Sequence, residues 1–440
     1  MRMGDGPIRG RLALVGAAAA PGAYLGAADY LGWPHPGLGA PVAVVVFGLG
    51  IVASAFLLTW AAEAAQVDLS AGLAIALLAV LAVLPEYAVD LVFTFRAGQQ
   101  YAEQGSCEHG GVNPCSLALA NMTGANRILV GFGWPLVVLV ATVAAVRARK
   151  RTATTEPGRV ALKPVMAVDV VFLGLATLYS LTLPLRSSLS LVDAVVFVGI
   201  FAAYVWRLAK APREEPELTG VAAWVGGRPK TRRRTLVAVL FGTAGLVILA
   251  TAEHFAESLV ATGHSLGVDE FLLVQWVAPI ASESPELVVA CLFAARLKAA
   301  ESLGTLLSSK VNQWTLLVGT IPIVFALSSG TTHGLPLDDN QRLELLITAA
   351  QSLFAVAVLI DLGVTALGAT ALLVLFAIQF VASITLSADA NRTVFLVLSA
   401  LYGVLAIGRL IMVRRTAART VRDGLTTRLT ELDAEPTGRR

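Results

Sequence analysis

Long apolar stretches separated by short polar loops occupy almost the whole chain. Each is close to the length of about 20 residues that an α-helix needs to cross the hydrocarbon core of a bilayer. The short alternating segments typical of a membrane barrel are missing from the sequence. The apolar stretches predict twelve spanning helices, at residues 10–31, 38–62, 70–95, 116–146, 165–184, 188–208, 234–261, 269–295, 301–328, 342–360, 363–385 and 392–412. We therefore predict an all-α polytopic membrane protein.

Composition supports this class. Of the 440 residues, 56% are hydrophobic and only 14% are charged, and the mean hydropathy is +0.74. Ordinary soluble domains are excluded by these values. Arg2, Arg9 and Arg11 precede the first apolar stretch, and no small-residue cleavage site follows them. We therefore expect a retained helix there, not a removed signal peptide.

Basic residues collect in alternate loops, which sets the expected orientation. They are Arg147, Arg149, Lys150, Arg151, Arg159, Lys163, Arg207, Lys210, Arg213, Arg228, Lys230, Arg232, Arg233, Arg234, Arg296, Lys298, Arg414, Arg415 and Arg419. The positive-inside bias assigns these loops to the cytoplasm. With twelve spans, both termini are then expected in the cytoplasm of a multi-pass cell-membrane protein.

Two stretches in different halves of the chain resemble each other. The stretch 84–96 matches 284–296, and the identical pairs include Pro85/Pro285, Glu86/Glu286, Phe93/Phe293 and Arg96/Arg296. Each stretch precedes an apolar helix in which an asparagine is followed at the same spacing by a glycine, and these pairs are Asn126/Gly133 and Asn312/Gly319. The predicted topology makes the two copies antiparallel. We therefore expect two inverted repeats with broken helices at the membrane midplane, as in many secondary transporters.

Carboxylates inside these apolar stretches are the main candidates for function. An ionised acid at bilayer depth is costly, so such residues usually mark an ion or proton path. Glu86 and Glu286 are the repeated acids, Asp90 follows the first by four positions, and Glu283 precedes the second by three. These spacings place each pair on one helix face. Two acids so close do not ionise together readily, which suits a proton carrier.

Cysteines offer a second kind of chemistry. Cys107 and Cys115 lie on a loop predicted to face outside, where oxidation is permitted, so they form either a disulfide or two free thiols. A zinc site that adds Glu108 and His109 is a third reading. Cys291 lies within a predicted span, where we expect ordinary packing.

Polar segments divide the chain further. The expected division is an extra N-terminal helix (1–37), a first repeat half (38–208), a basic cytoplasmic linker (209–234), a second repeat half (235–413) and a cytoplasmic tail (414–440). The tail is rich in Thr and Arg, and its composition predicts partial disorder.

With these motifs, the chain resembles a divergent member of the cation/calcium antiporter superfamily, the membrane region of sodium/calcium exchangers. That family carries a G-T-S-x-P-E type stretch in each inverted repeat, followed by a G-N-x-x-G-S-N-x-x-N type stretch. Residues 281–286 (ASESPE) stand against the first pattern, and residues 308–313 (SSKVNQ) against the end of the second. The likeness covers mainly 60–146 and 250–328.

The resemblance implies a set of cation ligands. Glu86 and Glu286 take the places of the two central glutamates, and Ser309 that of a ligating serine. The amide position falls on Arg127 and Gln313, or on Asn126 and Asn312 after a shift of one position. A neutral amide oxygen suits a hard cation, which favours the asparagines. The implied cation-binding residues are Glu86, Glu286, Asn126, Asn312, Ser309, Ser282 and Gln313.

The chain also departs from that pattern. Residues 81–84 (LAVL) replace the Gly-Thr-Ser of the first repeat, and Lys310 and Arg127 bring positive charge near the expected site. These cations oppose Ca²⁺ by Coulomb repulsion. Glu283, Asp90, Lys310 and Arg127 are therefore either charge-tuning or proton-carrying groups, or members of structural salt bridges.

The expected function is a secondary active antiporter that exchanges Ca²⁺ or another cation for Na⁺ or H⁺. The alternatives are a non-transporting paralogue with a structural or partner-binding role, or a membrane enzyme. The sequence holds no paired-His metal motif, nucleophile elbow or phosphate loop, which disfavours an enzyme. No cofactor is expected beyond the transported Ca²⁺, Na⁺ or H⁺. The expected partners are membrane lipid and inorganic cations, with no nucleic acid.

Overall fold

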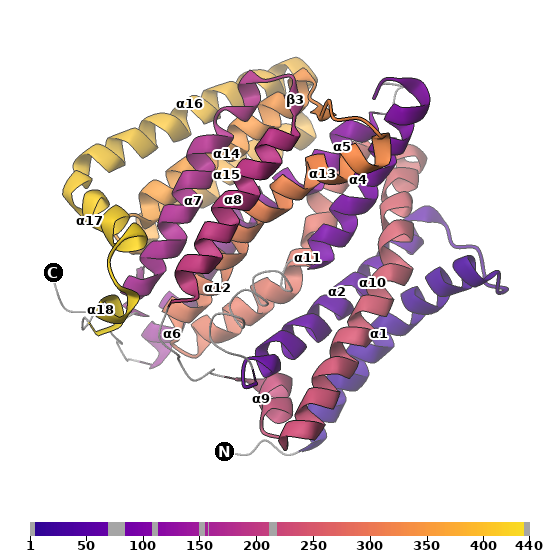
Figure 1. Ribbon diagram of the computed structural model, residues 1–440, viewed down its shortest axis with the longest axis horizontal. Helices are drawn as coiled ribbons and strands as arrows, with labels where there is room; N and C mark the ends of the chain where they lie inside the picture. The colour runs from indigo at the N-terminus through magenta and orange to yellow at the C-terminus, as the bar shows by residue number, and fades with distance from the viewer. Residues whose placement is uncertain are drawn as a thin grey trace. The chain divides into compact units, whose positions relative to one another are not determined.

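The structure is a computed structural model that describes residues 5–68, 84–107, 113–148, 155–156, 158–210 and 218–434. Its chain forms two compact units. Unit 1 comprises residues 1–93 and 213–285, and unit 2 comprises residues 94–212 and 286–440. Both units are helical, and each combines a segment from the first half of the sequence with one from the second half (Figure 1).

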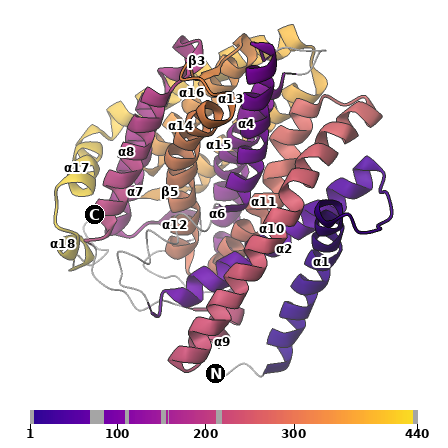
Figure 2. The same ribbon diagram turned by 45° about the vertical axis from the view of Figure 1, so that its right-hand side comes forward.

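Unit 1 is built on three long helices that lie side by side (Figures 1 and 2). Its helices are α1 (Asp5–Leu31), α2 (Ala40–Ala65), the start of α4 (Leu84–Gln104), α9 (Gly220–Gly226), α10 (Lys230–Leu266) and the first part of α11 (Glu270–Ala295). Aliphatic side chains of α2 and α10 pack between them, among them Leu57, Leu58 and Ile248. A side chain at Gly26 of α1 would collide with the backbone oxygen of Ala250 in α10, so glycine permits this close approach.

Unit 2 holds the remaining elements. Its helical elements are α5 (Pro114–Ile128), η1 (Leu129–Gly133), α6 (Trp134–Ala148), η2 (Pro164–Met166), α7 (Ala167–Ser180), η3 (Leu183–Leu185), α8 (Leu191–Leu208), α12 (Ala299–Asn312), η4 (Gln313–Leu317), α13 (Val318–Ser329), α14 (Asp339–Leu359), α15 (Ala366–Thr385), α16 (Ala388–Met412), α17 (Arg414–Leu425) and α18 (Leu429–Ala434), together with the last parts of α4 and α11. Its short strands are β1 (Thr155–Glu156), β2 (Arg159–Ala161), β3 (Ser188–Leu189), β4 (Leu335–Pro336) and β5 (Gly363–Thr365).

Two small antiparallel sheets mark the two ends of unit 2. Strands β1, β2 and β5 pair at what we call the sheet end, where Val160 lies opposite Val364. Strands β3 and β4 pair at what we call the hairpin end, where Ser188 lies opposite Pro336. Both sheets therefore tie a loop from the first half of the sequence to a loop from the second half.

The helices α5–α6 and α12–α13 run in opposite directions between these ends (Figure 1). At the sheet end, the amide of Gly158 beside β2 donates to the Thr142 hydroxyl of α6, and β2 packs against α12. At the hairpin end, Asn113 just before α5 donates to the carboxylate of Asp338, which lies beyond α13 (2.9 Å). The antiparallel course is the one that inverted repeats require.

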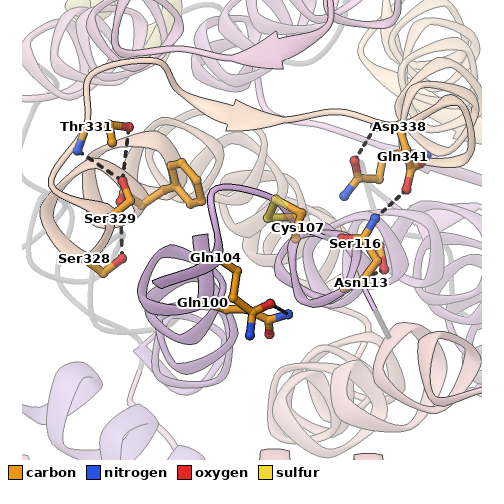
Figure 3. Close-up of a disulfide and its surroundings, with 12 residues drawn as sticks. Gln100, Gln104, Cys107, Asn113, Ser116, Ser328, Ser329, Thr331, Asp338 and Gln341 are labelled. Atoms are coloured by element: carbon orange, nitrogen blue, oxygen red, sulfur yellow. Dashed lines mark hydrogen bonds between the residues drawn. A yellow bond between two sulfur atoms is a disulfide. The ribbon is translucent and has the colours of Figure 1, made fainter. Parts of the chain in front are cut away.

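A disulfide between Cys107 and Cys115 closes the loop before α5 (Figure 3). The disulfide reading of these cysteines is therefore confirmed. Asn113 also caps α5, since its side-chain oxygen accepts from the backbone amide of Ser116 (3.2 Å). Glu108 and His109, the other predicted zinc ligands, lie outside the described residues.

The predicted spans agree well with the helices. Among the described residues, ten helices are long and apolar enough to cross a membrane, and α11 adds another as two segments on either side of Pro285. The boundary expected near residues 361–363 is confirmed by β5, which separates α14 from α15. The predicted span 70–95 is only partly described, because residues 69–83 fall outside, and α4 continues to Gln104.

The prediction of a partly disordered tail is wrong for residues 414–434. They form α17 and α18, which dock on the sheet end of unit 2. The Arg207 guanidinium of α8 donates to the carbonyl of Gly424 (3.1 Å), and the Thr420 hydroxyl donates to the carbonyl of Ile360 (2.7 Å). Composition alone missed these contacts because both partners belong to helices or loops far away in the sequence.

Candidate functional site

The predicted acids on α4 of unit 1 are buried. Glu86 and Asp90 lie one turn apart on α4, and both are at most 1% exposed. Neither Glu86 oxygen has a hydrogen bond of normal geometry from the described residues, although the Ser282 hydroxyl of α11 is close enough to act on it. A buried carboxylate with so few donors needs a bound cation or proton to offset its lost hydration.

The part of α11 that carries Ser282 holds two more buried polar groups of unit 1. Glu283 is fully buried beside Ser282. Gln275 lies two helical turns before Ser282, which puts both on one helix face. Its amide is fully buried, and neither amide atom finds a hydrogen-bond partner in the described part of the chain. Sequence reasoning did not single out Gln275, although an amide inside an apolar stretch was a signal.

Unit 2 supplies the other predicted ligands. Glu286 begins its part of α11 and is 6% exposed. Asn126 of α5 and Ser309 and Asn312 of α12 are also buried, as is Gln313. The Ser309 hydroxyl has no hydrogen-bond partner among the described residues. Unit 2 therefore places buried hydroxyl, amide and carboxylate groups in the helices of both repeats.

A wide π-helical turn follows each asparagine. The first, η1, begins shortly after Asn126, and the second, η4, begins directly after Asn312. Such turns contain an extra residue and are frequent at functional sites. The η1 turn packs against α12, and η4 packs against α5, so the two irregular segments lie close to the opposite repeat.

Lys310 of α12 contacts Asn126 of α5 directly. Its ammonium group donates to the Asn126 side-chain oxygen (2.6 Å) and lies 3.3 Å from the backbone oxygen of the same residue. The Asn126 amide nitrogen donates to the carbonyl of Met122 (2.8 Å), which turns the side-chain oxygen toward Lys310. Lys310 is fully buried, and its ammonium lies 4.7 Å from the centre of the Trp314 ring.

Arg127 points to a different neighbour, because successive residues of an α-helix diverge by about 100°. Its guanidinium pairs with the carboxylate of Glu344 in α14 (2.6 Å) and lies 5.9 Å from the centre of the Phe395 ring. Its carbonyl accepts from the Gln351 amide (3.4 Å). Sequence reasoning missed Glu344, which lies at the start of a predicted span and resembles an ordinary helix-end acid.

A second missed carboxylate lies on the sheet-end side of unit 2. Asp169 of α7 accepts from the Tyr204 hydroxyl of α8 (2.6 Å) and from the Ser308 hydroxyl of α12 (2.9 Å). Asp169 therefore fixes the side chain of Ser308, which directly precedes the predicted ligand Ser309. An acid just inside an apolar stretch was a signal that could have found it.

Comparison with known proteins gives a consistent result. The family model described as sodium/calcium exchanger protein matches residues 39–210 and 236–385. A crystal structure of an H⁺/Ca²⁺ exchanger, CAX, shares 40% sequence identity over 97% of this chain and 99% of its own, with a TM-score of 0.84.

More distant structures agree in fold. Native YfkE shares 15% identity over 84% of this chain and 100% of its own (TM-score 0.59). A selenium-substituted form of YfkE, described as a Ca²⁺/H⁺ antiporter, covers 90% of this chain (TM-score 0.54). No curated protein matches the sequence. The family match covers well over half of the residues, and the chain therefore belongs to the sodium/calcium exchanger protein family.

Proposed function

We propose that this member of a family of cation antiporters exchanges Ca²⁺ for H⁺ by secondary active transport. The observation that carries the proposal is the burial of Glu86 in α4, with few hydrogen-bond donors around its carboxylate. The 40% identity to an H⁺/Ca²⁺ exchanger over nearly the whole chain supports the choice of ions.

The proposed ligands divide by chemistry. Glu86 and Glu286 supply the negative charge, and hydroxyl and amide oxygens supply the remaining contacts. The proposed hydroxyl and amide ligands are Ser282, Ser309, Asn126, Asn312 and Gln313. Ca²⁺ takes six to eight oxygen ligands, and carboxylate, hydroxyl and amide oxygens are of the kind that it prefers. Glu283 and Asp90 tune the charge of the site and are the proposed additional proton carriers.

Exchange follows from sharing one set of carboxylates. A carboxylate binds either a proton or part of the charge of a calcium ion, so each ion excludes the other. Alternating access then delivers the two ions in opposite directions. Na⁺ is the competing driving ion, and the same assay distinguishes it.

The test uses purified protein in liposomes that hold a pH-sensitive dye. Addition of external Ca²⁺ should move protons out of the carboxylates and change the internal pH, and a Na⁺ gradient should not replace the proton gradient. Calcium uptake driven by Na⁺ alone would overturn the choice of H⁺.

Glu86→Gln and Glu286→Gln should each abolish exchange while the protein still folds. The amide keeps the shape of the side chain but removes the charge that offsets the desolvation of the cation. Glu103→Gln is the matched control, because Glu103 is an exposed acid on the same helix as Glu86. Normal flux in either buried variant would remove that residue from the proposed site.

We also propose that both termini lie in the cytoplasm. The sheet end of unit 2 carries Arg159, Lys163 and Arg207, whereas the disulfide lies at the hairpin end. Basic loops favour the cytoplasm, and disulfides favour the oxidising side. Cysteines placed near Lys150 and Arg232 should label only from inside, and one near Thr332 only from outside. Labelling of all three from one side would contradict this orientation.

A further inference from the structure

We propose that Lys310 is a specificity-determining residue, whose ammonium group occupies the Asn126 oxygen until the transported cation displaces it. This inference rests on the proposed function, since it takes Asn126 as a ligand. Lys310 then acts as an internal competitor, and its charge sets how well the site accepts divalent relative to monovalent cations.

The geometry around Asn126 is that of an occupied ligand. Its two oxygens, one from the side chain and one from the backbone, both face the Lys310 ammonium, at 2.6 Å and 3.3 Å. The amide nitrogen is already used by the carbonyl of Met122, so the side-chain oxygen has a fixed direction. Two oxygens of a single residue directed at one positive centre are the arrangement that a metal cation would also use.

Trp314 gives the ammonium a weakly directional partner. The ring is fully buried, and its centre lies 4.7 Å from the Lys310 nitrogen. A ring face attracts a cation without a directional hydrogen bond. The lysine side chain is also a flexible four-carbon stem. The ammonium can therefore leave Asn126 without breaking a rigid set of contacts at the ring.

Arg127 makes a useful contrast on the helix that carries Asn126. Its charge is met by the Glu344 carboxylate at 2.6 Å, on the α14 side of the helix. Lys310 instead reaches across from the other repeat to a residue that carries the expected amide ligand. The Lys310 ammonium thus donates to the oxygen of a proposed ligand.

The proposal predicts a graded effect of charge. Coulomb energy scales with the charge of the entering ion, so repulsion by Lys310 acts twice as strongly on Ca²⁺ as on Na⁺. Lys310→Asn should lower the KM for Ca²⁺ about tenfold, which corresponds to about 1.4 kcal/mol. The apparent affinity for Na⁺, read from its competition with Ca²⁺ uptake, should improve only about threefold.

The experiment measures initial rates of Ca²⁺ uptake into liposomes at fixed pH for wild type, Lys310→Asn and Lys310→Arg. Lys310→Arg keeps the charge and should keep a KM near that of wild type. Lys210→Asn is the matched control, because Lys210 also lies one helical turn from a tryptophan but is exposed, with its nitrogen 3.2 Å from the centre of the Trp206 ring. This control should change nothing.

A milder variant keeps the test decisive if Lys310→Asn folds poorly. Trp314→Phe leaves the lysine in place but weakens its hold, because Phe is a weaker cation–π partner than Trp. Its KM for Ca²⁺ should fall by a smaller factor than in Lys310→Asn. A lower maximal rate with an unchanged KM would assign Lys310 a structural role instead.

The outcomes separate this inference from the proposed function. Wild-type protein that exchanges Ca²⁺ for H⁺, with the same or a higher KM in both Lys310→Asn and Trp314→Phe, would overturn the inference alone. Wild-type protein that moves Na⁺ but not Ca²⁺ would overturn the proposed function. In that case the Na⁺ affinity is read from Na⁺ uptake itself, and a threefold lower KM for Na⁺ in Lys310→Asn would still support the competitor role.

Discussion

The helix pairs α5–α6 and α12–α13 have the same plan, but the basic residues beside their asparagines have different partners. Arg127 follows Asn126 and is held by an acid of α14. Lys310 precedes Asn312 and reaches the opposite repeat, where it donates to Asn126. Both cations are fully buried. A buried positive charge near a predicted ion site can thus belong to the scaffold or contact the ligands, and only its partner distinguishes the two.

The largest effect should come from breaking the scaffold pair. Arg127→Met leaves the Glu344 carboxylate buried without its partner, which should lower the free energy of unfolding by about 3–5 kcal/mol. The double variant Arg127→Met/Glu344→Leu should recover most of this loss, because apolar pairs often replace buried ion pairs well. Thermal unfolding in detergent measures both.

Arg422→Met is the control for that experiment. Arg422 is exposed, and its Nε lies 3.5 Å from the Asp423 carboxylate. Exposed pairs of this kind contribute under about 1 kcal/mol. If Arg127→Met were as stable as Arg422→Met, the assignment of Arg127 to the scaffold would be wrong.

A smaller effect is expected at the other centre. Asn126→Leu removes the acceptor of the Lys310 hydrogen bond and should lower stability by about 1–3 kcal/mol. It should also raise the KM for Ca²⁺, because a proposed ligand is lost. Lys310→Asn should lower the same KM, so the two partners of one hydrogen bond should shift it in opposite directions. If both variants shifted the KM for Ca²⁺ in the same direction in uptake assays, the distinction between Lys310 and the scaffold cation Arg127 would be wrong.

The smallest effect concerns the connections that lead into the two helix pairs. A disulfide closes the first, whereas the second is a tight turn in which Leu297 adopts a positive φ of 63°. A left-handed conformation costs a non-glycine residue about 1–2 kcal/mol. Leu297→Gly should therefore raise stability by about 0.5–1 kcal/mol, after the entropy that glycine adds to the unfolded chain.

Leu292→Gly should instead lower the free energy of unfolding. Leu292 is exposed on α11, where glycine should cost about 1 kcal/mol of helix stability. The melting temperatures of the two variants, each compared with that of wild type, measure these opposite effects on stability. A loss of stability in Leu297→Gly similar to that in Leu292→Gly would mean that the Leu297 side chain contributes more than its backbone conformation costs.

Most of the fold was readable from the sequence because hydropathy reports membrane burial directly. Most predicted spans match helices of the structure, whereas the span 70–95 is only partly described. Helix α10 starts at Lys230, ahead of the predicted span, because its first turn is basic and lies outside the apolar pattern. The tail helices also lie outside the apolar pattern. They were missed because tertiary contacts stabilise them, such as that of Arg207 with Gly424.

The site was only partly readable. Glu86 and Glu286 were found from the sequence because they are repeated and because an ionised acid inside an apolar stretch is energetically costly. Neither signal requires knowledge of the residues that contact them. The partner of Arg127 could not be found this way, because Glu344 belongs to the other half of the sequence and resembles a helix-end acid. The direction of Lys310 depends on the turn of α12 against α5, which no local pattern in a single sequence specifies.

The two π-helical turns have a consequence for chain length. Each wide turn holds one residue more than the regular helix needs, so it behaves as a one-residue insertion that both flanking helices tolerate. Deleting Val130 from η1 would let α5 continue into α6 as an ordinary α-helix, with the faces on either side unchanged. The deletion would remove only the local widening after Asn126. A chain shortened by that single residue would therefore keep its architecture, and any change in its ion transport would show the contribution of the extra residue.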